Sequence, residues 1–145
     1  MKSPGRVLAS LILAAAALLG SARAQGEGFR VIVNPQNPVS ALSEQELSRL
    51  FLKKSVTWPG GGSVAPVDQE RTSAVRRAFS QKVHNKDADA VVAYWQTMVF
   101  SGRDTPPPVK ATDASVVEFV RANPGAVGYV TDSAELSGVK AVAVR

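Results

Sequence analysis

Apolar residues recur at two spacings along the chain, and these spacings predict interleaved strands and helices. Runs rich in β-branched residues predict strands over 29–34, 63–67, 126–130 and 139–144. Apolar residues three and four positions apart predict four helices, which start near positions 43, 72, 87 and 112. Because helices and strands interleave, we expect an α/β fold in which about four helices flank a small mixed sheet.

The start of the first predicted helix is defined by several local signals. Ser43 and Glu46 have the spacing of a capping box, in which each side chain bonds a backbone N–H of the other residue. Leu42 and Leu47 occupy the positions of a hydrophobic staple. The helix is predicted to end near residues 53–54.

The other three helices are predicted from their inward faces and their end signals. The second is predicted to run from about 72 to 83, and its inward residues are Val75, Ala78, Phe79 and Val83. The third begins at Asp87 or Asp89, and its inward residues are Ala88, Val91, Val92, Trp95, Met98 and Val99. The fourth begins at Thr112 or Asp113, and its inward residues are Val116, Val117 and Val120.

Residues 1–24 have the pattern of a secretory signal peptide. Two basic residues precede an apolar run over 7–19, and Ala22 and Ala24 supply the small residues that a signal peptidase needs. The run is shorter than the roughly 20 apolar residues of a membrane-spanning helix. We therefore expect cleavage after Ala24, a periplasmic or secreted protein over 25–145, and no membrane span in the mature form.

Removal of this leader changes the charge of the chain. The whole sequence has 17 basic and 12 acidic residues, a formal net charge of +5. Three of the basic residues and none of the acidic ones belong to the leader, which leaves 14 against 12, or about +2. This small charge argues against a nucleic-acid partner. The sequence has no cysteine, so disulfides and thiolate chemistry are excluded.

The titratable residues form no pattern typical of catalysis. His84 is the only histidine, and its place near a predicted helix end indicates a surface side chain. Asp68 and Glu70 lie beside Arg71 in a predicted loop, which indicates a solvated charge group. We therefore expect no enzyme activity, no metal site and no cofactor.

Two further groups of residues allow more than one interpretation: the basic residues of the second helix, and the aromatic residues in and around the third. Arg76 and Arg77, with Lys82, predict a solvated basic face, which would alternatively support an anion site or contact a partner. The large aromatic and apolar residues in and around the third helix predict core packing or, alternatively, a contact patch; they are Trp58, Tyr94, Trp95, Met98 and Phe100.

Five short stretches occur in a recognisable order. They are LSEQEL (Leu42–Leu47), LFLKK (Leu50–Lys54) followed by Trp58, Pro66–Val67, the helix start Ser73–Phe79, and PGAVGYV (Pro124–Val130). This ordered set resembles the phosphate-binding branch of the type II periplasmic substrate-binding proteins, over about 31–130. Full members of that family have two α/β lobes around a cleft. The resemblance implies that the mature chain, which is long enough for about one lobe, has the fold of a single lobe.

The resemblance also implies an anion site. In the family, one lobe supplies an arginine and a Ser-Gly-Thr stretch at a helix N-terminus, where free N–H groups favour an anion. The family's serine falls on Ser73, whereas its Gly, Thr and Arg are replaced by Ala74, Val75 and Gln69. The implied site therefore consists of Arg71, Thr72 and Ser73. In the alternative interpretation, Thr72 or Ser73 only caps the helix and Arg71 is solvated.

These observations lead to two hypotheses for function. The first is an exported protein that binds phosphate or a similar oxyanion, in a weak or accessory role rather than as a complete transport receptor. Two or three charge-assisted hydrogen bonds in an open site, less the entropic cost of binding, give an affinity of about millimolar. The alternative is an accessory module that contacts another cell-envelope protein and needs no small ligand.

Overall fold

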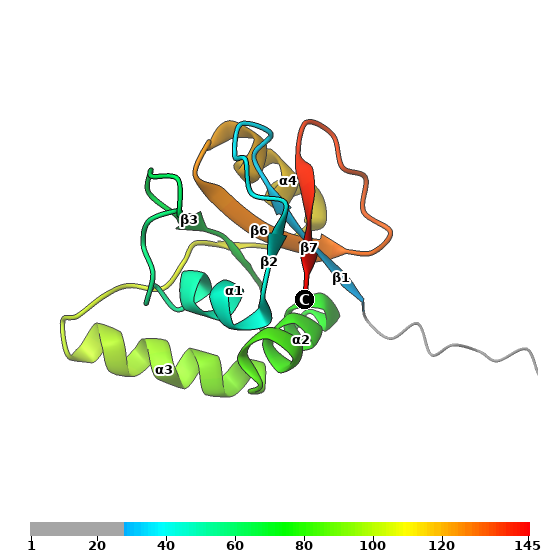
Figure 1. Ribbon diagram of the computed structural model, residues 1–145. Helices are drawn as coiled ribbons and strands as arrows, with labels where there is room; N and C mark the ends of the chain where they lie inside the picture. Colours follow the sequence, from blue (N-terminus) through cyan, green and yellow to red (C-terminus); the bar gives the residue numbers. More distant parts are fainter. Residues whose placement is uncertain (1–27) are drawn as a thin grey trace, which may run out of the picture.

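The computed structural model describes residues 28–145, so the predicted signal peptide and its cleavage site lie outside the described residues (Figure 1). In this part of the chain, five strands form one mixed sheet in the order β2-β7-β1-β6-β3, and β4 and β5 form a separate parallel pair. The strands are β1 (Phe29–Val33), β2 (Ala41–Leu42), β3 (Ala65–Pro66), β4 (Asp68–Gln69), β5 (Val109–Lys110), β6 (Ala126–Thr131) and β7 (Lys140–Val144).

Strand β1 is the centre of the larger sheet. It pairs antiparallel with β6 on one side, where Phe29 faces Thr131, and with β7 on the other, where Val31 faces Val142. The short strands β2 and β3 add parallel edges to β7 and β6. The predicted mixed α/β architecture is therefore confirmed. The strand predicted over 63–67 is shorter than expected, because the chain leaves the sheet after β3 to form β4.

Each helix begins where the sequence predicts. The helices are α1 (Glu44–Phe51), α2 (Ala74–Phe79), α3 (Ala88–Phe100) and α4 (Asp113–Ala122), and α2 continues directly into the π-helix η1 (Ser80–His84). The N-cap side chains accept hydrogen bonds from the first turns; they are Ser43, Ser73, Asp87 and Thr112. Ser43 and Glu46 form the complete capping box. These local hydrogen bonds satisfy N–H groups that helices leave free, which explains why the starts are readable from sequence.

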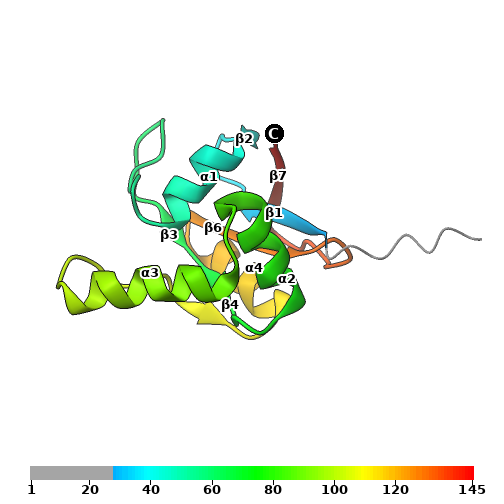
Figure 2. The same cartoon turned by 90° about the horizontal axis from the view of Figure 1, so that it is seen from below.

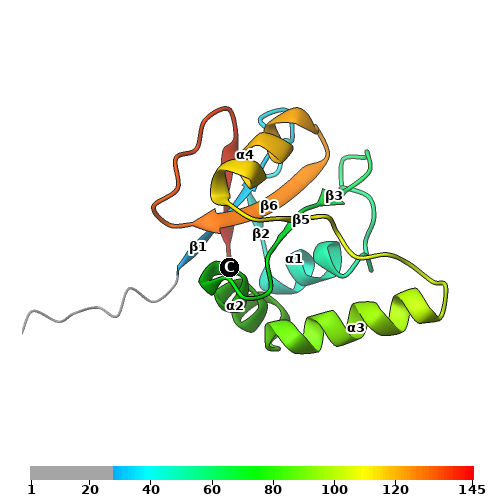
Figure 3. The same cartoon turned by 180° about the vertical axis from the view of Figure 1, so that it is seen from behind.

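The helices cover the two faces of the sheet unequally. Helix α4 packs on one face, whereas α1 and α2 pack on the other (Figures 1 and 3). The core on the α4 side consists of Ile32, Val67, Val116, Val117, Val120, Ala126 and Val130. The core on the other side is larger and contains aromatic residues from three elements, among them Phe51, Phe79 and Tyr129. Along β1 and β6, successive residues belong alternately to one core and the other, as expected for a sheet that is buried on both faces.

Helix α3 extends away from the rest of the molecule (Figure 2). It is held by a small cluster of Leu52, Val91 and Trp95, with Tyr94 and Met98 packed at its edge. The predicted inward face of α3 is therefore wrong in its last turns. Val99 is 49% exposed and Met98 is only half-buried, because this end of the helix reaches beyond the elements that could cover it. Val92, in the first half of α3, is half-buried as well.

The aromatic residues divide between the two predicted interpretations. Trp58 is buried, and its indole N–H donates to the Gly125 carbonyl at 3.0 Å. The Tyr94 hydroxyl donates to the Leu52 carbonyl at 3.1 Å. Phe100 is 90% exposed at the end of α3. Core packing is thus confirmed for Trp58, whereas Phe100 belongs to the surface. Over residues 28–145, no helix has both the length and the apolar character to cross a bilayer.

Candidate functional site

The turn before α2 contains the three residues of the predicted anion site. Ser73 is the N-cap of α2, and its Oγ accepts a hydrogen bond from the Arg76 N–H at 3.2 Å. The next two N–H groups, those of Ala74 and Val75, have no acceptor among residues 28–145. Two backbone donors at the start of α2 are therefore available to an acceptor from solution.

Arg71 and Thr72 lie on the surface of the same turn. The Arg71 guanidinium is 3.0 Å from the Asp89 carboxylate, and these side chains are 60% and 79% exposed. Thr72 is exposed, and its carbonyl accepts a hydrogen bond from Arg77. The structure thus brings Arg71, Thr72 and Ser73 together in one turn, with an acidic side chain already beside Arg71.

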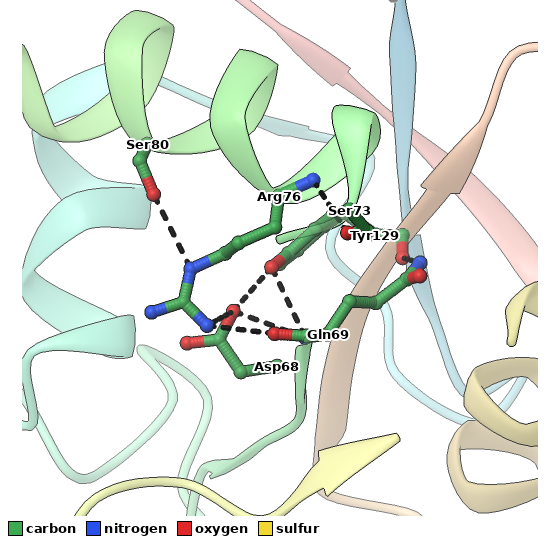
Figure 4. Close-up of polar contacts among 6 residues, drawn as sticks. All are labelled: Asp68, Gln69, Ser73, Arg76, Ser80 and Tyr129. Atoms are coloured by element: carbon green, nitrogen blue, oxygen red, sulfur yellow. Dashed lines mark hydrogen bonds and ion pairs between the residues drawn. The ribbon is translucent and has the colours of Figure 1, made fainter. Parts of the chain in front are cut away.

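Asp68 and Arg76 form a buried ion pair next to this turn (Figure 4). Each residue is 4% exposed, and Arg76 Nη1 is 2.9 Å from Asp68 Oδ1. The predictions of a solvated charge group at Asp68 and of a solvated basic face at Arg76 are therefore wrong. Arg76 lies three residues before Phe79, so the helical spacing itself places it on the inward side.

Backbone and side-chain partners hold the ion pair in place. Asp68 Oδ1 also accepts hydrogen bonds from the Tyr129 hydroxyl and from the Gln69 N–H. Arg76 Nη1 donates to the Gln69 carbonyl at 2.8 Å, and Nε donates to Ser80 Oγ at 3.3 Å. The network therefore links β4, α2, η1 and β6 (Figure 4).

Gln69 takes part in this network through its side chain as well. Its amide donates to Asp113 Oδ1 at 3.0 Å and to the Tyr129 carbonyl at 2.9 Å. Asp113 in turn accepts two hydrogen bonds from Thr131. Gln69 is 3% exposed, so the position on which the resemblance places the family's arginine has a structural role in this chain.

Burial controls the protonation of the network. Desolvation raises the pKa of the Tyr129 phenol, and the neighbouring Asp68 carboxylate raises it further. Desolvation also raises the pKa of Asp68, while the Arg76 guanidinium opposes this rise. Tyr129 therefore remains a neutral donor to Asp68, which is consistent with a structural network rather than a reacting one.

His84 lies in the interior rather than on the surface, so its predicted location is wrong. It is 9% exposed at the end of η1, and its Nδ1 is 2.8 Å from Ser48 Oγ in α1. Its ring meets the edge of Phe79 with centroids 5.6 Å apart. Burial, together with the nearby cations Arg76, Lys54 and Lys86, lowers the pKa of His84 to about 4.

This lowered pKa predicts a pH-dependent stability. Between about pH 6.5 and pH 4 the unfolded chain protonates His84 while the folded protein does not. The free energy of unfolding should therefore fall as the pH drops through this window, by on the order of 3 kcal/mol. An NMR titration of the His84 ring gives its pKa, and urea unfolding at pH 7 and 4.5 gives the stability.

The control for this prediction is His84→Gln, whose loss of stability between the two pH values should be smaller than that of the wild type. Carboxylates titrate equally in both proteins, so the difference isolates the histidine. A ring pKa of about 6 or higher, or equal losses in both proteins, would contradict the prediction.

Residues 28–145 contain no group of three or more acidic or histidine side chains that could hold a metal ion. The sequence matches no protein-family model, and a search of curated proteins gives no match either. Comparison with solved structures, in contrast, identifies clear similarities of fold.

Three solved structures illustrate these similarities. An ABC-type phosphate transport receptor from Vibrio cholerae is 21% identical, with a TM-score of 0.63 over 81% of this chain and 46% of that one. A putative phosphate ABC transporter substrate-binding protein with bound phosphate, from Clostridium perfringens, is 23% identical, with a TM-score of 0.64 over 81% and 44%. PstS from Borrelia burgdorferi is 14% identical, with a TM-score of 0.62 over 84% and 52%.

These comparisons confirm the fold expected from the resemblance. The chain has the fold of part of a phosphate-type substrate-binding protein, and it spans about half the length of these receptors. The first two are named as a transport receptor and as a substrate-binding protein, not as enzymes.

Proposed function

We propose that this protein binds phosphate or a similar small oxyanion weakly, through Arg71, Thr72 and Ser73 at the start of α2. The observation that carries the proposal is the position of Ser73. In a fold shared with phosphate receptors, it caps a helix whose next two N–H groups have no acceptor among residues 28–145. Backbone N–H groups at a helix start favour an anion, and hydroxyl and guanidinium groups add donors.

The ion pair of Arg71 with Asp89 does not prevent this role. Exposed ion pairs of this kind contribute only about 0–1 kcal/mol, so an anion with several donors competes with Asp89 for the guanidinium. The affinity of the site is low, because the turn is exposed and water competes with the anion for the same donors. We expect dissociation constants of about 1 mM.

A weak open site fits an accessory role better than a transport receptor. Because the chain spans about half the length of the receptors, we propose that residues 28–145 correspond to about one lobe of such a receptor. Its predicted leader places it in the periplasm or outside the cell. The proposed role is therefore that of an exported protein that binds oxyanions weakly, in an accessory role.

Calorimetry with phosphate, sulfate and chloride at constant ionic strength tests the site. Phosphate is expected to bind at about millimolar affinity, and Arg71→Ala is expected to weaken it about tenfold. Ser73→Asp is the sharper variant, because aspartate preserves the N-cap while its negative charge repels the anion. It should abolish binding without lowering the melting temperature.

Arg103→Ala serves as the matched control, since Arg103 is an exposed arginine outside the turn. It should leave phosphate binding unchanged. Equal binding by the wild type and Ser73→Asp, or no heat of binding with any of the three anions, would rule out the proposed site.

A second candidate is an accessory module that contacts another envelope protein and needs no small ligand. The exposed side chain of Phe100, on the projecting end of α3, favours it. A photo-crosslinking residue at position 100 should give one specific adduct in envelope extract. The same residue at the exposed position of Val56 should give none. Identical adduct patterns at both positions would remove this candidate.

A further inference from the structure

A pocket of about 430 Å³ lies between α3, the connector before β5 and the turn before α2. Its volume is within the range of small-molecule sites. Most of its wall is apolar and includes Val92, Trp95, Val99, Phe100, Pro106 and Pro107. The polar side chains of Glu70, Arg71 and Gln96 also line it. The buried side chains of Asp68 and Arg76 line it as well, which gives an apolar pocket with a charged pair.

The ion pair leaves one acceptor and one donor without protein partners. All hydrogen bonds of the Asp68 carboxylate within residues 28–145 use Oδ1, and those of the Arg76 guanidinium use Nε and Nη1. Figure 4 shows the other oxygen of Asp68 and the other terminal nitrogen of Arg76 on the same side, away from Gln69 and Tyr129. Neither atom is fully enclosed by protein, so both are accessible to a ligand that enters the pocket.

Trp95 adds a third unpartnered group. It lines the pocket and is 5% exposed, and its indole N–H is buried without an acceptor among the described residues. By contrast, the other indole N–H, that of Trp58, is bonded to the Gly125 carbonyl. A donor that is buried and unpaired is unfavourable in the free protein. Because this nitrogen is enclosed by protein atoms while the side chain lines the pocket, Trp95 is a reporter on the pocket wall rather than a ligand contact.

The charges of the pair select the chemistry of that group. A carboxylate ligand would face the free oxygen of Asp68, and an amine would face the free nitrogen of Arg76. A neutral carboxamide offers an acceptor to Arg76 and a donor to Asp68 at once. We propose that this pocket binds a neutral carboxamide that carries an aromatic or branched apolar body, which packs against the apolar wall. The proposal does not rest on oxyanion binding, although Arg71 belongs to the proposed oxyanion site and also lines this pocket.

NMR titration of the ¹⁵N-labelled protein tests the proposal with three probes that share one apolar body: phenylacetamide, phenylacetate and phenethylamine. The indole signal of Trp95 should shift and saturate with the amide, while that of Trp58 should remain in place. The amide should bind at least about fivefold more tightly than either charged probe. Equal affinities for the three probes, or no shift at Trp95, would overturn the proposal.

Two variants separate the pocket from non-specific binding. Phe100→Ser removes an exposed part of the wall and should weaken the amide at least about threefold without unfolding the protein. Val56→Ser changes another exposed apolar residue, which lies outside the pocket, and it should leave the affinity unchanged. An unchanged affinity in Phe100→Ser, or equal losses in both variants, would contradict the assignment.

A fourth probe distinguishes a small amide molecule from the amide groups of a peptide segment. N-acetylphenylalaninamide carries the aromatic ring together with two amide groups, as a peptide segment does. Tighter binding of this probe than of phenylacetamide would assign the pocket to a peptide segment, and weaker binding would assign it to a small amide. Either result supports an amide site, whereas binding of neither probe overturns it.

Discussion

Asp68→Ala is expected to lower the free energy of unfolding by about 3–5 kcal/mol, a large fraction of the stability of a typical domain. The change leaves the Arg76 guanidinium buried without a countercharge, and it removes the acceptor of the Tyr129 hydroxyl. Removal of one partner of a buried pair is costly because the remaining charge is neither solvated nor paired. Urea unfolding followed by circular dichroism at pH 7 measures the loss.

The double variant Asp68→Leu with Arg76→Met is the control for this result. It removes both charges, so no uncompensated charge remains, and apolar replacements of a buried pair are often neutral. The double variant should therefore recover most of the stability that Asp68→Ala loses. A loss below about 1 kcal/mol in Asp68→Ala would show that Arg76 finds water or another partner.

Phe79→Ala is the second change with a large expected effect, again about 3–5 kcal/mol. Phe79 is fully buried in α2 and stacks on the Tyr129 ring, with centroids 3.8 Å apart and the planes 6° from parallel. It also contacts the rings of Phe29 and Phe51, at 5.3 Å and 4.7 Å between centroids. Its removal opens a cavity in the larger of the two cores and costs the aromatic contacts as well.

Phe100→Ala is the matched control, because the same side chain is removed at a position that is 90% exposed. It should change the free energy of unfolding by no more than about 0.5 kcal/mol. Because Phe79 stacks on Tyr129 and Tyr129 bonds Asp68, the losses of Phe79→Ala and Asp68→Ala should not add. Additive losses would mean that the ring stack does not position the hydroxyl.

The helix starts could be predicted because their signals are local. Ser43 and Glu46 are three residues apart, and their reciprocal hydrogen bonds form wherever the chain turns into a helix. The longer strands β1, β6 and β7 are also visible from their β-branched residues, whereas the two-residue strand β2 and the order of the strands are not. Order depends on pairings such as Phe29 with Thr131, which no local pattern encodes.

The buried polar residues could not be predicted for the same reason. Asp68 is buried because Tyr129 and Arg76 satisfy it, and His84 because Ser48 and the aromatic core surround it. Tyr129 is 61 residues from Asp68 and Ser48 is 36 residues from His84, so no local pattern shows these partners. A charged residue without a visible partner is predicted to be solvated, and that prediction fails whenever the fold supplies the partner.

The position of β7 has a consequence for the time at which the protein can fold. This strand, Lys140–Val144, inserts between β2 and β1, so the early strands of the chain have no direct pairing with each other. A chain that emerges from a ribosome or a translocation channel with its N-terminal end first cannot complete the sheet until β7 has also emerged. The order of strands thus delays completion of the sheet until the last of its strands has been synthesised.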